Sequence, residues 1–364
     1  MYCLNRYPLY LVLCTLLPQI LDMRCKLVLL LSFLLFGLKA SAQEGIPVYF
    51  DYLADNYYLV FPSMAGISEC GKIRATARKQ WFDVEDAPNL QTINGHFRLG
   101  DSPSGVGAII FNDANGYHSQ TGFKGTYAHH LRMGSEDVRV LNQLSFGLSA
   151  TVLQSSLDET EFRSVDFDPA VSGIKLNETY YNVDFGMSYS YQEFFTHFAV
   201  LNALSSKRNL YRVNRNDDPD NLTIPRVDNL RRYIISAGYV FGRSEWQFEP
   251  SVLFQLTDFT KEKTVDINAK LYKDVNFGRI WGGVSYRRSF DGAQFQTATS
   301  FGEQRLQLIT PIVGANFNKF MISYNYSYQM GDIRFDNGGF HQITLGFDFC
   351  KPEKRYDCYC PAAN

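Results

Sequence analysis

The sequence has no long apolar run after its first 40 residues. A membrane-spanning helix needs about 20 apolar residues, and residues 43–364 contain no such stretch. Gly-x-Ser-x-Gly, His-Glu-x-x-His and P-loop motifs are also absent. The 35 basic and 37 acidic residues nearly balance and are scattered, so nothing indicates a nucleic-acid partner. We therefore expect no enzyme, and no catalytic, cofactor-binding or metal-ligating residue.

Cysteine is scarce, with seven residues in the chain. Three of them precede residue 26, which leaves Cys70, Cys350, Cys358 and Cys360. Four cysteines in an oxidising compartment permit disulfides, but their pairing does not follow from spacing. A metal site is the alternative interpretation, and a single Cys-x-Cys without a nearby histidine offers it little support.

The apolar run near the start is typical of a secretory signal peptide. Residues 27–38 are apolar, follow two basic residues and end in a small-x-small sequence, so we expect cleavage between Ala42 and Gln43. A membrane anchor is the alternative, but the run is short for one. Met23 starts a signal of normal length, and we interpret it as the true start within the leader region 1–42.

The rest of the chain repeats one pattern, in which apolar or aromatic residues alternate with small or polar ones. Residues 183–191 and 320–328 are clear instances. Because side chains of a strand alternate between its faces, each segment has one apolar and one polar face. A soluble sandwich would bury the apolar face. Many such segments behind a secretion signal, with 23 Tyr and 29 Phe in the chain, favour a barrel in the outer membrane.

Fourteen segments have this strand character, and none of helical period competes with them. An even number is typical of antiparallel barrels in the bacterial outer membrane, where closure removes unpaired edges. We therefore predict an all-β chain that forms a closed transmembrane antiparallel barrel across residues 71–350. The segments lie near residues 71–82, 90–99, 104–112, 119–130, 140–154, 179–191, 193–202, 231–242, 245–257, 264–275, 277–289, 304–315, 319–330 and 339–350.

The connections alternate between long and short. Residues 155–179 and 203–230 are long, whereas most even-numbered connections are tight turns; residues 131–139 are an exception. Long extracellular loops opposite short periplasmic turns are typical of outer-membrane barrels. The alternation also predicts a lipid-facing set, which consists of Phe185, Met187, Tyr189, Ile322, Tyr324, Leu345 and Phe347.

Residues 43–70 break the strand pattern. Their aromatic residues are irregularly spaced, and Pro62 and Gly66 disfavour a regular element. One interpretation is a periplasmic lead-in packed at the barrel mouth, and the other is a plug inside the lumen. Residues 351–364 form a cysteine-containing tail, which an even strand count places in the periplasm.

Short motifs follow one another in a fixed order along the mature chain. The lead-in contains Pro62-Ser63-Met64-Ala65-Gly66, and the first strand ends in Arg78-Lys79-Gln80-Trp81, followed by Ala87-Pro88-Asn89-Leu90-Gln91. Further positions are Asp113, Asn182, Gly186, Gly238, Glu249 and Pro250. This order resembles the PorP/SprF membrane proteins of the Bacteroidota type IX secretion system, with their motifs NP-x-x-AG, R-x-QW and AP-x-TQ. Phe61 departs from that pattern, since it stands where the family has Asn.

The resemblance implies a function that the residues alone do not. It implies a non-enzymatic outer-membrane barrel that binds type IX secretion components or an exported surface protein, such as a gliding adhesin. A barrel of this kind supports the export of that protein or its attachment to the cell surface. The partners would then be these proteins and outer-membrane lipids, and no cofactor is implied. A passive porin for small solutes and a soluble secreted β-protein remain as alternatives.

Overall fold

A computed structural model provides the structure of the protein. It divides the chain into two units, residues 1–41 and 42–364, and every residue described here lies in the second. The described residues are 53–68, 70–80, 86–134, 139–162, 173–204, 207–208, 227–228, 230–242, 245–258, 260–296, 301–330, 339–350 and 356–358. The expected signal peptide, its cleavage site at Ala42 and Gln43, and Trp81 lie outside them.

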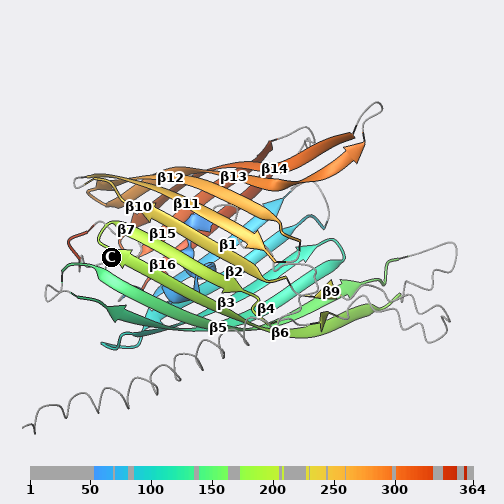
Figure 1. Cartoon of the computed structure of the whole chain (residues 1–364), viewed down its shortest axis with the longest axis horizontal. Helices are drawn as coiled ribbons and strands as arrows, with labels where there is room; N and C mark the ends of the chain where they lie inside the picture. Colours follow the sequence, from blue (N-terminus) through green and yellow to red (C-terminus); the bar gives the residue numbers. More distant parts are fainter. Residues whose placement is uncertain are drawn as a thin grey trace, which may run out of the picture. The chain divides into compact units, whose positions relative to one another are not determined.

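Fourteen strands form one closed antiparallel barrel (Figure 1). Each strand pairs with its neighbours along the chain, and β1 pairs with β16 to close the ring, beginning at Lys72 opposite Asp348. The prediction of a closed 14-stranded antiparallel barrel is confirmed. The strands are β1 (Lys72–Gln80), β2 (Asn89–Arg98), β3 (Ser104–Asn115), β4 (His118–Arg132), β5 (Asn142–Asp158), β6 (Lys175–Tyr191), β7 (Phe194–Leu201), β10 (Arg232–Tyr239), β11 (Trp246–Thr257), β12 (Lys263–Val275), β13 (Gly278–Gln296), β14 (Phe301–Phe317), β15 (Phe320–Met330) and β16 (Gly339–Asp348).

The remaining elements are short. Three 3-10 helices precede the barrel, namely η1 (Leu53–Asp55), η2 (Tyr57–Leu59) and η3 (Pro62–Met64). A separate two-stranded sheet, β8 (Lys207–Arg208) with β9 (Val227–Asp228), lies in the long connection between β7 and β10. The sequence pattern did not predict this pair, because two residues are too few to show alternation. Among the described residues, no helix is long and apolar enough to cross a membrane.

One end of the barrel is made of tight turns. Two residues separate β6 from β7, β12 from β13 and β14 from β15. Gln192 and Asn318 adopt positive φ angles of 50° and 53°, as the first residue of the favoured two-residue hairpin turns does. At the opposite end β5, β6, β13 and β14 extend to 17–19 residues. We call these the short-turn end and the long-loop end.

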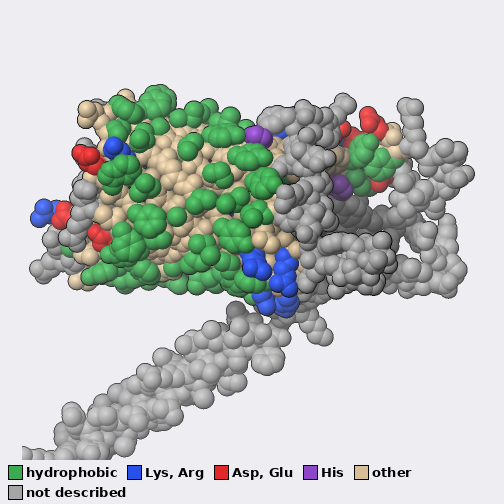
Figure 2. Space-filling view, turned by 90° about the horizontal axis from the view of Figure 1, so that it is seen from above, with side chains coloured by type: hydrophobic (Ala, Val, Ile, Leu, Met, Phe, Trp, Pro, Cys, Tyr) green, Lys and Arg blue, Asp and Glu red, His purple; other side chains and the backbone are tan. Residues whose placement is uncertain are grey.

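The outer face of the barrel carries the apolar side chains. Figure 2 shows them as a broad belt, with few charged side chains within it. Along β2, Ile93 and Phe97 are exposed, whereas Thr92, Asn94 and His96, which have the opposite parity, are buried. A soluble sandwich would show the reverse arrangement. The belt is the surface that an outer-membrane barrel presents to lipid.

Two contacts hold the segment that follows β16 at the short-turn end. A disulfide joins Cys70, just before β1, to Cys350, just after β16, so it lies beside the seam that closes the barrel. The tail then packs on the connection between β4 and β5. Tyr356 accepts a hydrogen bond from Arg132 at 3.0 Å and is buried with Cys358 against Leu141. The tail therefore contacts the longest connection at this end of the barrel.

Candidate functional site within the barrel

The lead-in lies inside the barrel. Its 3-10 helix η3 contacts β4, β5 and β6, and Leu59, Phe61 and Ala65 are at most 1% exposed. Tyr58 donates a hydrogen bond to Thr126 of β4 at 3.2 Å. Ser63 lies 2.6 Å from the hydroxyl of Ser188 on β6. Residues 53–67 therefore pack against lumen-facing side chains, and we call them the lumenal segment.

Glycines on the barrel wall make room for the backbone of the lumenal segment. Gly147 of β5 and Gly186 of β6 are cross-strand partners that face the lumen. A Cβ on Gly147 would overlap the backbone of Pro62 and Ser63, and one on Gly186 would lie 2.9 Å from the Ser63 nitrogen. Only glycine permits this approach. The pair forms a seat for the turn of backbone that begins η3.

A second close approach lies at the end of the lumenal segment. Gly66 has a φ of +68°, and a Cβ there would come within 2.6 Å of the Cα of Gly105 on β3. On Gly105 a Cβ would overlap the carbonyl oxygen of Ala65. The Ala65-Gly66 pair therefore needs small residues on both sides of the contact, as the Gly147–Gly186 seat does.

Polar side chains of β2 and β4 bind the backbone at this point. His130 donates from Nε2 to the Ala65 carbonyl at 3.0 Å, and His96 accepts at Nδ1 from the Gly66 N–H at 3.0 Å. Arg98 donates to the carbonyls of Gly66 and Ile67 at 3.2 and 3.1 Å. A turn buried in this way would otherwise leave backbone groups unpaired. These bonds hold the lumenal segment at a fixed depth.

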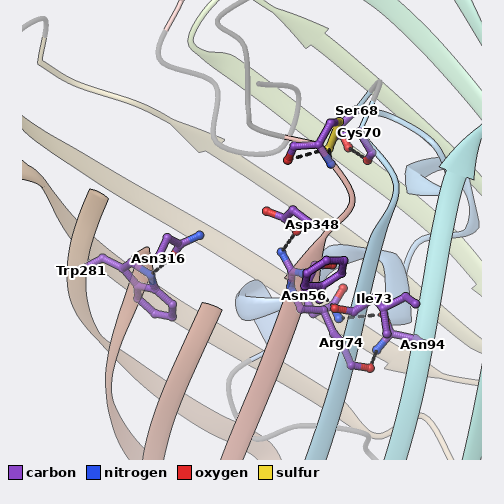
Figure 3. A network of polar contacts seen from close by, with 11 residues as sticks. Asn56, Ser68, Cys70, Ile73, Arg74, Asn94, Trp281, Asn316 and Asp348 are labelled. Atoms are coloured by element: carbon purple, nitrogen blue, oxygen red, sulfur yellow. Dashed lines mark hydrogen bonds and ion pairs between the residues drawn. A yellow bond between two sulfur atoms is a disulfide. The ribbon is translucent and has the colours of Figure 1, made fainter. Parts of the chain in front are cut away.

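The other end of the lumenal segment is held by ionic and amide contacts. Lys270 of β12 lies 3.4 Å from the carboxylate of Asp55 and over the ring of Trp281. Asn56 donates to Asn94 of β2 at 3.2 Å, as Figure 3 shows. Burial raises the pKa of Tyr57 well above its ordinary value, and the carboxylate of Glu249 adds to this rise. The segment is thus anchored on opposite walls of the barrel.

The barrel wall pairs its own buried charges. Asp266 accepts two hydrogen bonds from the Arg287 guanidinium, both at 2.8 Å, and both side chains are buried. Lys124 of β4 and Asp184 of β6 form a second buried ion pair. Pairs of this kind satisfy charges that would be costly to bury alone. They do not form the ring of like charge that would select a permeating ion.

A cavity of about 980 Å³ lies between the lumenal segment and the short-turn end. Tyr57 and Met64 line it from the lumenal segment, and Phe277 and Asn318 line it from the turns. Its lining includes four basic residues (Lys72, Arg74, Lys270 and Arg279) and four acidic residues (Asp55, Glu249, Asp274 and Asp348). Arg74 pairs with Asp348 at 2.8 Å, and Arg279 pairs with Asp274 at 2.7 Å. The lining of the cavity thus mixes apolar and aromatic side chains with charged ones, and the charges are close to balance.

Four motif positions of the sequence lie at the two close approaches. Pro62 and Gly186 meet at the glycine seat, and Ala65 and Gly66 pack against Gly105. Elsewhere, Glu249 accepts a hydrogen bond from Tyr272 at 3.0 Å beside the cavity, and Asn182 bonds the backbone of Leu204 just after β7. The spacing of these residues gave no sign of these contacts.

The other motif positions are separate from this site. Gln80 bonds through its backbone N–H to Pro88, so Ala87 and Pro88 close the connection from β1 to β2. Arg78 lies over the ring of Phe340. Gln91 is exposed, and Asp113, Gly238 and Pro250 are partly buried on their strands.

The residues predicted to face lipid lie on the outer face. Phe185, Met187, Ile322, Tyr324 and Leu345 are 38–56% exposed, and the residues between them are buried. Tyr189 is half-buried because its hydroxyl reaches Asn142, and Phe347 is half-buried between Phe320 and Phe349. Exposure to lipid itself stays a prediction.

The sequence contains one local signal for the glycine seat, which is the parity of its two glycines. Gly147 and Gly186 occupy positions of the same parity as the lumen-facing Ser145, Ser149 and Ser188. A glycine in a strand often marks a close approach of another backbone. Two lumen-side glycines on adjacent strands therefore indicate that something packs against the wall there. In the described part of the chain, no group of three or more His, Cys, Asp or Glu side chains could hold a metal.

The solved structures that are similar to this chain share little sequence with it. No curated protein matches the chain. Among solved structures, CdiB from Acinetobacter baumannii has 7% identity and a TM-score of 0.42 over 78% of this chain and 60% of its own. Omp33 of Acinetobacter baumannii has 9% identity and a TM-score of 0.40 over 78% of this chain and 100% of its own. Salmonella typhi OmpF, in complex with daunomycin, has 11% identity and a TM-score of 0.35 over 77% of this chain and 97% of its own.

The family comparison covers most of the sequence. The family described as type IX secretion system membrane protein PorP/SprF matches residues 41–347. This range contains the lumenal segment, thirteen barrel strands completely, and all of β16 except Asp348. An apolar belt around a closed barrel places such a membrane protein in the outer membrane. The chain belongs to the PorP/SprF family of type IX secretion system membrane proteins.

Proposed function

We propose that this protein is a non-enzymatic barrel that holds partner proteins of the type IX secretion system and does not conduct solutes. The observation that carries the proposal is the lumenal segment, which is seated on glycines and bonded to opposite walls of the barrel. A porin keeps its interior polar and filled with water. Here residues 53–67 fill part of that space with buried backbone and aromatic side chains.

The charges inside the barrel support the same proposal. Arg287, Lys124 and Lys270 each face a carboxylate. A pore for ions or charged nutrients needs side chains that contact the permeating solute. Charges already paired across the wall hold the structure together instead. The passive porin is therefore the weaker alternative.

The surface we assign to periplasmic partners is the short-turn end. It combines the cavity, the exposed Phe277 and the docked tail residues 356–358. Aromatic and arginine side chains are the residue types that dominate protein interfaces. If the short turns face the periplasm, this end meets the secretion machinery, and the long loops meet an exported surface protein.

Deletion of the gene tests the proposal. We expect reduced surface delivery of at least one exported protein, or impaired gliding, with unchanged uptake of small solutes. Surface proteomics and uptake of a labelled solute measure the two effects in the same strain. Complementation with the unaltered gene is the control. Normal secretion and motility with slower uptake would support a porin and contradict the proposal.

A pull-down from outer-membrane extract identifies the partner class. We expect the tagged barrel to recover type IX components or an exported surface protein, which mass spectrometry would identify. A barrel of similar size from the same membrane provides the background. Recovery of the same proteins by both barrels would remove the support for a dedicated binding role.

A further inference from the structure

Three neighbouring strands carry a basic residue on their outer face beyond a run of apolar residues. On β13 the outward residues run from Ile280 and Val284 through Tyr286 to Arg288, toward the long-loop end, and the exposed aromatic Phe290 follows. On β12 the outward Ile267 and Val265 are followed by Lys263. On β14 the outward Ile309 is followed by Gln307 and then Arg305.

The strand register brings these three cations together. Arg288 lies opposite Val265 on β12 and opposite Gln307 on β14. Lys263 and Arg305 are each two residues further toward the long loops on their own strands. Diagonal neighbours across strands are about 7–8 Å apart, which is within reach of long side chains. The three side chains therefore fall within reach of one ligand.

The cluster faces outward and not into the lumen. The neighbours of Arg288 on β13 are Arg287 and Ser289, which are 5% and 9% exposed, and Arg287 binds Asp266 inside the barrel. Arg288 and Lys263 themselves are exposed, and Arg305 is half-buried. Figure 2 shows basic side chains gathered at a rim of the apolar belt.

Nearby acidic groups leave the cluster basic. Asp258 is held by Lys261 at 3.0 Å and by Arg231 at 3.8 Å, so two further cations offset it. Asp291 accepts from the backbone N–H of Lys263, and Glu262 is exposed in the turn before β12. Among the side chains that the structure describes around the cluster, five basic residues (Arg231, Lys261, Lys263, Arg288 and Arg305) stand against Asp258, Glu262 and Asp291.

The depth of the cluster indicates the ligand. Tyr286 is the next outward-facing residue of β13 from Arg288 toward the apolar belt. Its hydroxyl donates a hydrogen bond to Gln307 at 3.0 Å. Tyrosine marks the boundary between hydrocarbon and headgroups in membrane barrels. Lipid phosphates lie just beyond that boundary. Arginine presents a fork that fits phosphate oxygens, and lysine adds a compact charge.

We propose that Lys263, Arg288 and Arg305 bind the phosphorylated headgroup of an outer-leaflet glycolipid of the lipid A class. The site is on the outside of the barrel, at the end that we expect to face the cell exterior, and the proposal does not depend on the binding of secretion partners. The barrel would carry a bound lipid at the strands that reach furthest past the membrane. Free phosphate shares the chemistry and is separated by experiment.

Native mass spectrometry of the purified, delipidated barrel titrated with lipid A tests the site. We expect the unaltered protein to bind lipid A in preference to phosphatidylethanolamine. Replacing all three cations, as Lys263→Gln, Arg288→Gln and Arg305→Gln, should weaken lipid A binding roughly 100-fold, since each contributes about ten-fold or less. Heat-modifiable migration on a gel confirms that the variant still folds.

Lys273→Gln is the matched control. Lys273 is on the same strand and outer face but at the short-turn end, over the ring of Trp246. We expect it to leave lipid A binding unchanged. Unchanged binding by the triple variant, or an equal loss with Lys273→Gln, would overturn the site. Displacement of lipid A by millimolar inorganic phosphate would show a site for the free anion and overturn the lipid assignment.

Discussion

Replacement of Gly147 by valine should unseat the lumenal segment. The new side chain would occupy the space of the Pro62 and Ser63 backbone, which lies directly against the glycine. Forcing side-chain atoms into such a contact costs about 3 kcal/mol, the upper end of the usual range for overpacking. Because the barrel wall is fixed by hydrogen bonds to both neighbouring strands, the segment is the part that should move.

Hydrogen exchange measures this effect directly. In the unaltered protein the N–H groups of residues 59–61 and 64–67 are buried and hydrogen-bonded, so they should exchange slowly. In Gly147→Val they should exchange much faster, while β5 and β6 keep their protection. Gly125→Val is the control, because Gly125 lies on β4 with only the Phe123 ring near its Cβ, at 3.7 Å. Equal protection of the segment in both variants would contradict the glycine seat.

Replacement of Met187 by arginine should destabilise the barrel in the membrane. Met187 is on the outer face of β6, four residues from the short-turn end of the strand, which places it near the centre of an apolar band roughly 25 Å tall. Arginine at that depth costs about 2–4 kcal/mol. Reversible unfolding in lipid vesicles by denaturant measures the free energy.

Tyr191→Arg is the control on the same strand and face. Tyr191 ends β6 and is 46% exposed at the short-turn rim. The cost of arginine falls to about 0–1 kcal/mol near the interface. Equal costs at the two positions would contradict the assignment of this face to lipid.

The structure changes the expectation for the lumen side of β6. Alternation alone predicts that Ser188, next to Met187, tolerates arginine because it faces a polar lumen. In the structure Ser188 is 2% exposed, and its hydroxyl contacts Ser63 and His197. Arginine has no room there. The alternation identified the correct face, but it carries no information about what fills the lumen.

The barrel could be predicted because its rules are local. Period-two alternation identifies each strand, and the fourteen predicted segments correspond one to one with the barrel strands. The limits differ mainly at the long-loop end, where β13 continues to Gln296 past a bulge between Arg288 and Gly292. We expect this extension to lie beyond the membrane, where the outward positions of a strand need no apolar side chains.

The lumenal site could not be predicted in the same way. Its contacts join residues that are far apart in the chain, such as Asp55 with Lys270 and Ser63 with Ser188. The disulfide between Cys70 and Cys350 spans 280 positions, and four cysteines allow three pairings. Such contacts depend on the order and register of strands around the ring. Only the lumen-side glycines carried a local signal.

Conductance of the unaltered protein in planar lipid bilayers tests the central claim most directly. If the lumenal segment closes the barrel, the protein should insert without steady openings of porin size. Gly147→Val should give steady openings of porin size in the same assay. The variant is therefore the positive control, because its openings show that the assay detects inserted barrels. Steady porin-like conductance of the unaltered barrel would contradict the account.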